Sequence, residues 1–137
     1  MNRRQQQVGM SVLGMLIIVI MAGFFVLSAI RMAPVYFEYL SVRDIVSRAA
    51  GDPESVDESI GDIRRKFEAV FHTNQIDGLK AREMEIYRKD GKTYIDARYE
   101  VRLPIFWRID AVLKFDDLFY VIGESAPVDP AVAADRP

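Results

Sequence analysis

Hydrophobic residues dominate one long segment near the start of the chain. No charged residue occurs from Gln5 to Ile30, and thirteen of the 23 residues of 8–30 are Val, Ile, Leu or Phe. A helix of that length is about 35 Å long, enough to cross a hydrocarbon core of roughly 30 Å. Each of those side chains favours the bilayer centre by about 0.3 to 0.6 kcal/mol. The pattern therefore predicts one transmembrane helix over 8–30, after a short tail of residues 1–7.

Beyond residue 30 the apolar residues recur at helical spacing, in two stretches. The first covers 35–49 and ends at Gly51-Asp52-Pro53, where glycine and proline stop a helix. Ser55–Glu58 matches a capping box and predicts the start of the second helix. Its apolar stripe is formed by Val56, Ile60, Ile63, Phe67, Val70 and Phe71. Pro34 is expected either in a first turn or at a kink against the membrane helix.

A period of two then predicts antiparallel strands. Apolar and polar residues alternate over 93–103, and Asp90-Gly91 joins this strand to one within 79–89 as a hairpin turn. A further strand over 108–116 is expected to turn four residues inward: Ile109, Ala111, Leu113 and Phe115. Residues 118–122 are either a fourth short strand or an apolar cover.

The fold class predicted from these elements is α+β. An N-terminal transmembrane helix is followed by two helices packed on a three- or four-stranded antiparallel meander, in a domain covering 31–123. The last segment, 124–137, is rich in Ala, Pro and Asp and is expected to be disordered.

Charge predicts the orientation of the span. The short tail carries Arg3 and Arg4 and no acidic residue, and positive residues stay inside, so the domain is expected in the periplasm and the N-terminus in the cytoplasm. The competing interpretation is a signal peptide cleaved near Val26-Leu27-Ser28, but the apolar run is longer than the usual signal core of about 7 to 15 residues. Residues 31–137 have a net charge of −4, which argues against nucleic acid or an anionic membrane surface as the main partner.

Residues that could carry chemistry have simpler structural explanations. The chain has no cysteine, and its single histidine, His72, suits a helix C-terminus better than catalysis without a partner. Asp116 and Asp117 point to opposite faces of a strand, so a strand end is favoured over a carboxylate pair. The polar strand faces predict cross-strand pairs among Asp96, Arg98, Glu100, Arg102, Arg108, Asp110 and Lys114. We expect no enzyme, no cofactor and no metal site.

Two groups of residues are candidates for binding other molecules. Pro104, Ile105, Phe106 and Trp107 form an unusually apolar turn, which either docks a partner protein or the membrane interface, or folds Phe106 and Trp107 back over the core. Small residues on the membrane helix could instead support helix pairing. These are the patch of Gly9, Ser11 and Gly14 and the pair Ala29 and Ala33. Other envelope proteins or further copies of the chain are the expected partners.

Three segments carry a resemblance to a known family. Gln7–Gly14 (QVGMSVLG), Ala33–Tyr39 (APVYFEY) and Tyr99–Pro104 (YEVRLP) resemble the small proteobacterial membrane proteins grouped as domain of unknown function 4845. The resemblance implies a single-pass inner-membrane protein from a Gram-negative source, without an assigned activity or site residues. Its periplasmic domain is then expected to bind protein partners or to support an envelope assembly.

A second, shorter resemblance concerns the N-terminus. Gly9-Met10-Ser11-Val12-Leu13 is similar to the start of type IV prepilins and pseudopilins, and the order of helix then antiparallel sheet suits a pilin-like domain. That motif has a glutamate where this chain has Gly14. The resemblance implies, as the alternative function, a minor pilin-like component of a type IV pilus or type II secretion-like assembly. We expect a chain processed no further than loss of Met1.

Overall fold

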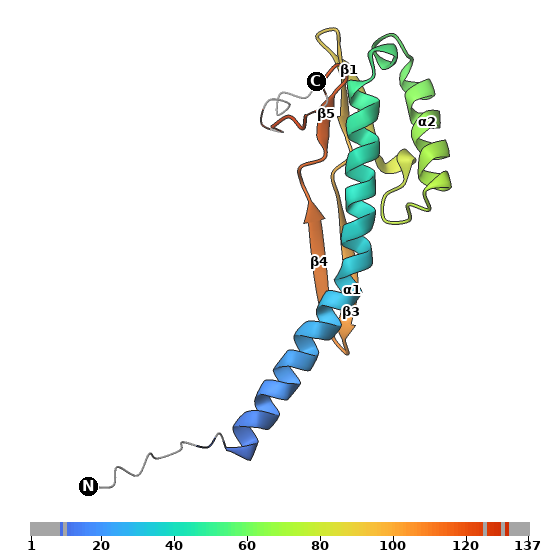
Figure 1. The fold of residues 1–137 in the computed structure, drawn as a ribbon. Helices are drawn as coiled ribbons and strands as arrows, with labels where there is room; N and C mark the ends of the chain where they lie inside the picture. Colours follow the sequence, from blue (N-terminus) through green and yellow to red (C-terminus); the bar gives the residue numbers. More distant parts are fainter. Residues whose placement is uncertain (1–8, 10, 125, 130, 132–137) are drawn as a thin grey trace, which may run out of the picture.

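A single helix, α1 (Val12–Gly51), joins the apolar segment to the rest of the chain in the computed structural model, which describes residues 9, 11–124, 126–129 and 131 (Figure 1). The predicted tail 1–7 and part of 124–137 lie outside these residues. Pro34 stands inside α1 and the helix changes direction along its length (Figure 1). A proline removes one backbone donor and kinks a helix, and here the chain continues past it. The predicted transmembrane helix and the predicted helix over 35–49 are therefore parts of one helix.

Helix α2 (Ile60–Thr73) follows a short 3₁₀ turn, η1 (Pro53–Val56). The capping box predicted at Ser55 is wrong: Ser59 is the N-cap, and its hydroxyl accepts a hydrogen bond from the Asp62 amide. Pro53 begins η1, and the Asp52 carboxylate accepts from the Glu54 amide at 3.0 Å, so that turn occupies the predicted start of the helix.

In the described part of the chain, five antiparallel strands form two small sheets. They are β1 (Glu85–Lys89), β2 (Lys92–Asp96), β3 (Tyr99–Phe106), β4 (Ile109–Phe115) and β5 (Phe119–Val121). One sheet has the order β1-β2-β5 and the other pairs β3 with β4. The predicted hairpin turn is confirmed, since Asp90 and Gly91 both have positive φ angles, of 50° and 74°.

The predicted strand over 93–103 is interrupted between β2 and β3, and residues 116–118 likewise separate β4 from β5. At the first break the Ala97 amide donates to the Leu118 carbonyl at 2.9 Å. The segment 118–122 contains β5 and is therefore a strand. The segment 79–84 belongs to a loop and the 3₁₀ turn η2 (Ala81–Glu83), so only the end of the strand predicted within 79–89 forms. The α+β class with an antiparallel sheet is confirmed.

The hydrophobic core lies where the second half of α1 meets α2 and the sheets. Tyr39, Val42 and Val46 of α1 are buried there together with Phe67 of α2 and Ile95 of β2. The first half of α1 contributes no residue to this core and is exposed along most of its length, with Ser28 the buried exception. It is the one described helix that is long and apolar enough to cross a membrane. An apolar helix projecting from a packed domain fits a single-pass membrane anchor.

Candidate functional site

The turn between β3 and β4 presents two aromatic side chains to solvent. Phe106 is 59% exposed and Trp107 is 88% exposed, and Pro104 is exposed beside them. Ile105, between Pro104 and Phe106, is only 4% exposed, so the strand buries one side chain and presents its neighbours to solvent. Of the two alternatives, the structure therefore favours a projecting tip over aromatic rings folded onto the core. We call Pro104, Phe106 and Trp107 the hairpin tip.

Backbone irregularities at the end of β3 explain why the hairpin tip projects. The register shifts between Pro104 and Phe106, as at a β-bulge, and Trp107 has a positive φ of 47°. A bulge re-aims the residues that follow it. Ile109, predicted to face inward, is 53% exposed. That prediction is wrong because the hairpin extends past the end of the core at this point.

The hairpin tip is tied to α1 at the end of the predicted span. The Arg31 guanidinium donates a hydrogen bond of 2.8 Å to the Pro104 carbonyl. At the other end of the hairpin, the rings of Tyr99 and Tyr39 both contact the ring of Phe115, with centroids 5.0 and 4.3 Å away. β3 therefore runs antiparallel to α1 and towards the membrane-spanning half of that helix (Figure 1).

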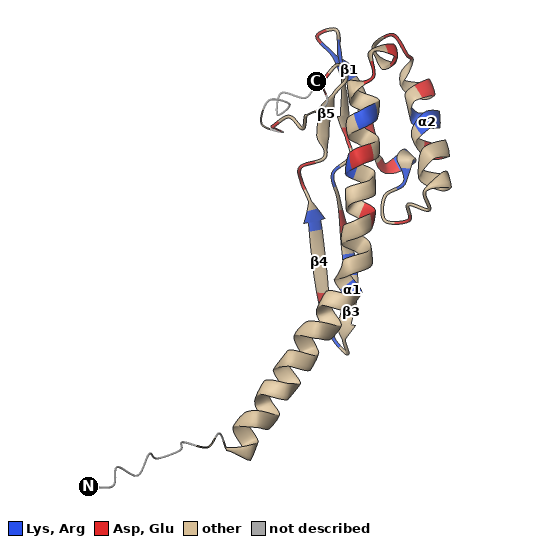
Figure 2. Cartoon of the chain, viewed as in Figure 1, with Lys and Arg blue, Asp and Glu red and all other residues tan. Residues whose placement is uncertain are grey.

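The small residues proposed for helix pairing lie on two separate parts of α1. A side chain added at Gly9 or Gly14 would meet nothing within 4 Å, and Ser11 is exposed. Ala29 is exposed and Ala33 is half-buried, and they lie about 22 Å and about 28 Å further along the helix than Gly14. The structure does not combine the two groups into one surface. Figure 2 shows that this first part of α1 carries no charged residue until the domain begins.

The predicted ladder of cross-strand charges forms only in part. Arg102 on β3 binds Asp110 on β4, with the guanidinium Nε 2.9 Å from the carboxylate. Asp96 was predicted on the wet face and is buried at 8% exposure, so that prediction is wrong. Arg98, two residues away, donates to both of its oxygens at 2.9 and 2.7 Å and lies over the Phe119 ring. This bidentate pairing lets the carboxylate be buried.

The titratable residues singled out by the sequence occupy structural positions. His72 is exposed near the end of α2. Asp117 lies between β4 and β5, which confirms a strand end, and it accepts a hydrogen bond from the Tyr39 hydroxyl. The pKa of Tyr39 is raised to about 12, mainly by burial of the hydroxyl and secondly by this hydrogen bond. Within the described residues there is no group of three His, Cys, Asp or Glu side chains that could hold a metal ion.

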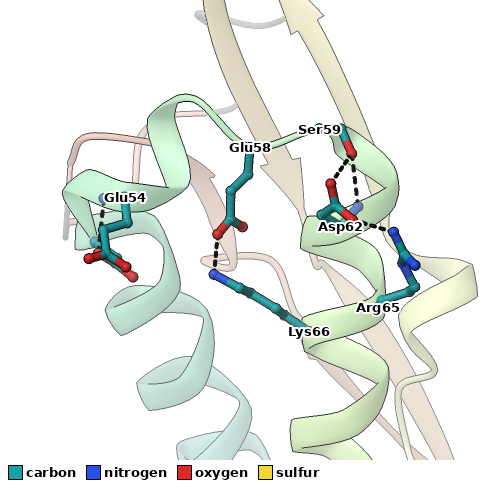
Figure 3. Close-up of polar contacts among 7 residues, drawn as sticks. Glu54, Glu58, Ser59, Asp62, Arg65 and Lys66 are labelled. Atoms are coloured by element: carbon teal, nitrogen blue, oxygen red, sulfur yellow. Dashed lines mark hydrogen bonds and ion pairs between the residues drawn. The ribbon is translucent and has the colours of Figure 1, made fainter.

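The sequence did not reveal a groove of about 510 Å³ between α1 and α2. Its walls are apolar, with Ile45 and Ala49 on one side and Phe67 and Val70 on the other. At its rim Lys66 forms an ion pair with Glu58, and this hydrogen bond raises the pKa of Lys66 (Figure 3). The clue in the sequence is that Ile45 and Ala49 widen the apolar face of α1 beyond the single stripe facing the sheet.

The fold is that of an α+β protein whose apolar N-terminal helix fits a membrane anchor, with an aromatic hairpin tip beside that helix. Residues 31–115 match the family model described as domain of unknown function (DUF4845), and the chain belongs to that family. The match covers the second half of α1, α2 and β1 to β4, including the hairpin tip. No curated protein and no solved structure matches the chain.

Proposed function

We propose that this protein is a single-pass inner-membrane protein whose periplasmic domain binds protein partners in an envelope assembly and catalyses no reaction. Its anchor and its domain share α1, a helix of 40 residues without a linker between them. A partner can therefore pack along one continuous helix from the bilayer into the domain. The membrane orientation rests on Arg3 and Arg4 in the short tail.

The observation that carries the proposal is an exposed apolar seam on α1. Its members are spaced by alternating steps of four and three residues, the heptad pattern of packed helices: Ala22, Val26, Ala29, Ala33, Tyr36 and Leu40. Small residues at such positions let two helices approach closely inside a membrane. Val26 is 58% exposed, Tyr36 51% and Leu40 38%, although Val42 and Val46 on the domain-facing side of the same helix are fully buried.

The outer part of the seam needs a protein to cover it. Leu40 lies nine residues beyond Arg31, or about 13 Å along the helix, whereas the headgroup region is roughly 5 to 8 Å thick. Nearby, the Glu38 carboxylate accepts hydrogen bonds from the Asp77 and Gly78 amides, so this turn of α1 stands with the folded domain. Lipid tails do not reach side chains at this height. A helix of another membrane protein, packed along the seam, covers them.

Cysteine crosslinking tests the seam directly, because the chain has no cysteine of its own. Tyr36→Cys, labelled in membranes with a photoactivatable maleimide, should form an adduct with a partner protein. Ser41→Cys is the matched control, since Ser41 is exposed on the next turn but off the seam. Adding Leu40→Glu to the Tyr36→Cys variant should abolish the adduct. Equal adducts at both positions, or none at either, would contradict the proposal, and an adduct of two copies would make the partner a second chain.

A minor pilin-like component is the second candidate function. The observation that favours it is the division of α1 into an exposed first half and a second half packed on antiparallel strands. Gly14, without the carboxylate of the pilin motif, argues for the first candidate. Intact mass separates the two: a chain that begins at Met10 would support the pilin-like assembly, and a chain that keeps the preceding residues would support the anchored partner-binding protein.

A further inference from the structure

The hairpin tip reaches the height at which the predicted span leaves the bilayer. Pro104 is bound to Arg31, the first charged residue after the span, and Trp107 lies three residues further along, at most about 10 Å at strand spacing. β3 runs towards the membrane, so these residues extend below Arg31. The span itself ends at Ile30, only one residue away along α1. The turn therefore stands beside the last turns of the span (Figure 1).

Burial within the span gives independent support for this placement. Ser28 is 9% exposed, although its neighbours Leu27 and Ile30 are 37% and 65% exposed. Ser28 lies eleven residues before Tyr39, three helical turns, and so shares the face that Tyr39 turns to the hairpin. Burial on the face that α1 turns to the hairpin thus extends to a residue inside the predicted span.

We propose that the hairpin tip enters the interface of the bilayer leaflet facing the domain, with Phe106 and Trp107 among the lipid headgroups, as a second membrane contact beside α1. Trp is favoured at membrane interfaces because its ring is apolar and its indole N–H is polar. The polar backbone of the turn sets the depth, since unpaired amides and carbonyls are tolerated among headgroups but not in hydrocarbon.

A bilayer is the occupant that the position of the tip selects. The span also exposes an apolar side chain on the face of α1 that meets the hairpin, since Phe24, four residues before Ser28, is 38% exposed. The apolar groove between α1 and α2 lies elsewhere, and no residue of the tip lines it. Arg108, next to Trp107 and exposed, adds a cation at the height of the lipid phosphates. The span and the tip together fix the tilt of the domain relative to the membrane. A single membrane helix would leave that tilt free to vary.

Trp107 is the single tryptophan of the chain and reports on this contact without labelling. The full chain is placed in phosphatidylethanolamine–phosphatidylglycerol vesicles, which are purified by flotation so that only inserted protein is measured. We expect blue-shifted emission, protection from iodide, and strong quenching by lipids brominated on the acyl chains near the headgroup. The control is Trp107→Phe combined with Val56→Trp. Val56 is 49% exposed, beyond the other end of α1's packed half, and a tryptophan there should stay open to iodide and insensitive to brominated lipid.

Each other outcome overturns the proposal. Red-shifted emission that iodide quenches would place the tip in water above the membrane. Emission that is shielded from iodide but unaffected by brominated lipid would mean that protein covers the tip, and dilution with lipid would then restore the exposure. Flotation of the protein in either case shows that α1 is inserted, so failure of the tip contact leaves the seam on α1 as a separate question.

Discussion

At the scale of single residues, one carboxylate connects the anchor helix to the domain. Glu38 accepts hydrogen bonds from the Asp77 amide at 3.3 Å and the Gly78 amide at 2.6 Å. A Cβ at position 78 would lie 2.5 Å from that carboxylate and 3.3 Å from the Tyr99 ring. Gly78 is therefore required for space rather than for its backbone angles. Charge-assisted hydrogen bonds of this kind are roughly twice as strong as neutral ones.

Gly78→Ala should destabilise the protein by about 1 to 3 kcal/mol, because the new methyl group displaces the Glu38 carboxylate from two backbone amides. Gly61→Ala is the matched control: it lies in α2, where a Cβ meets only the Ser59 hydroxyl at 3.9 Å. That change should stabilise by about 0.5 to 1 kcal/mol. Thermal unfolding of the full chain in detergent micelles, followed by near-ultraviolet circular dichroism, measures both. A Gly78→Ala variant as stable as the wild type would contradict this role of Glu38.

At the scale of elements, α2 depends on a cap that the sequence places four residues too early. The Ser59 hydroxyl accepts from the Asp62 amide and donates to the Asp62 carboxylate at 2.6 Å. This hydrogen bond from Ser59 is the main cause of a pKa of the Asp62 carboxyl below its ordinary value, and the charge of the Arg65 guanidinium is the second cause (Figure 3). A lowered pKa stabilises the fold above the ordinary carboxyl range, and the contribution disappears as the pH falls through the lowered value.

Ser59→Ala should cost about 1 kcal/mol near neutral pH, as the loss of an N-cap does. Since the Asp62 carboxyl then titrates nearer its ordinary value, the difference from the wild type should narrow as the pH falls through the carboxyl range. Unfolding in micelles at about pH 7 and about pH 3 measures this. Ser55→Ala, at the capping box that the sequence predicts, should show no such narrowing. If the difference between Ser55→Ala and the wild type does narrow at low pH, Ser55 rather than Ser59 caps the helix.

Local sequence patterns predict the helices and strands better than the breaks between them and their positions relative to one another. The apolar segment, the stripe of α2 and the Asp90-Gly91 turn each carry their signal within a few residues. The break after β2 has no such local signal. The apolar and polar residues keep alternating through the break, and the hydrogen bond from the Ala97 amide to the Leu118 carbonyl joins residues far apart in sequence. The burial of Asp96 likewise depends on Arg98 folding back onto it. The hairpin tip could be predicted as apolar, but its position could not, because the contact with Arg31 joins residues 73 apart in sequence.

At the scale of the whole molecule, one helix and one hairpin determine what can reach the membrane. α1 carries the domain without a linker, and β3 returns along it, so the hairpin tip and the end of the span lie together. The opposite end of the domain, with η1 and the turn between β1 and β2, is furthest from the apolar half of α1 (Figure 1). The seam on α1 and the hairpin tip lie on different sides of the same helix, so a partner and the bilayer can be bound at once.

The charge of the N-terminal tail determines on which side of the membrane we expect the domain and its hairpin tip. Alkaline phosphatase fused after Ala131, which keeps β5 in the protein, should be active, because the enzyme folds only outside the cytoplasm and Arg3 and Arg4 hold the tail inside. The fusion should also resist extraction with carbonate. Replacing both arginines with glutamate should lower the activity, since the bias that sets the orientation is then removed. A silent phosphatase, together with an active cytoplasmic reporter at the same position, would place the domain and its hairpin tip at the cytoplasmic leaflet instead.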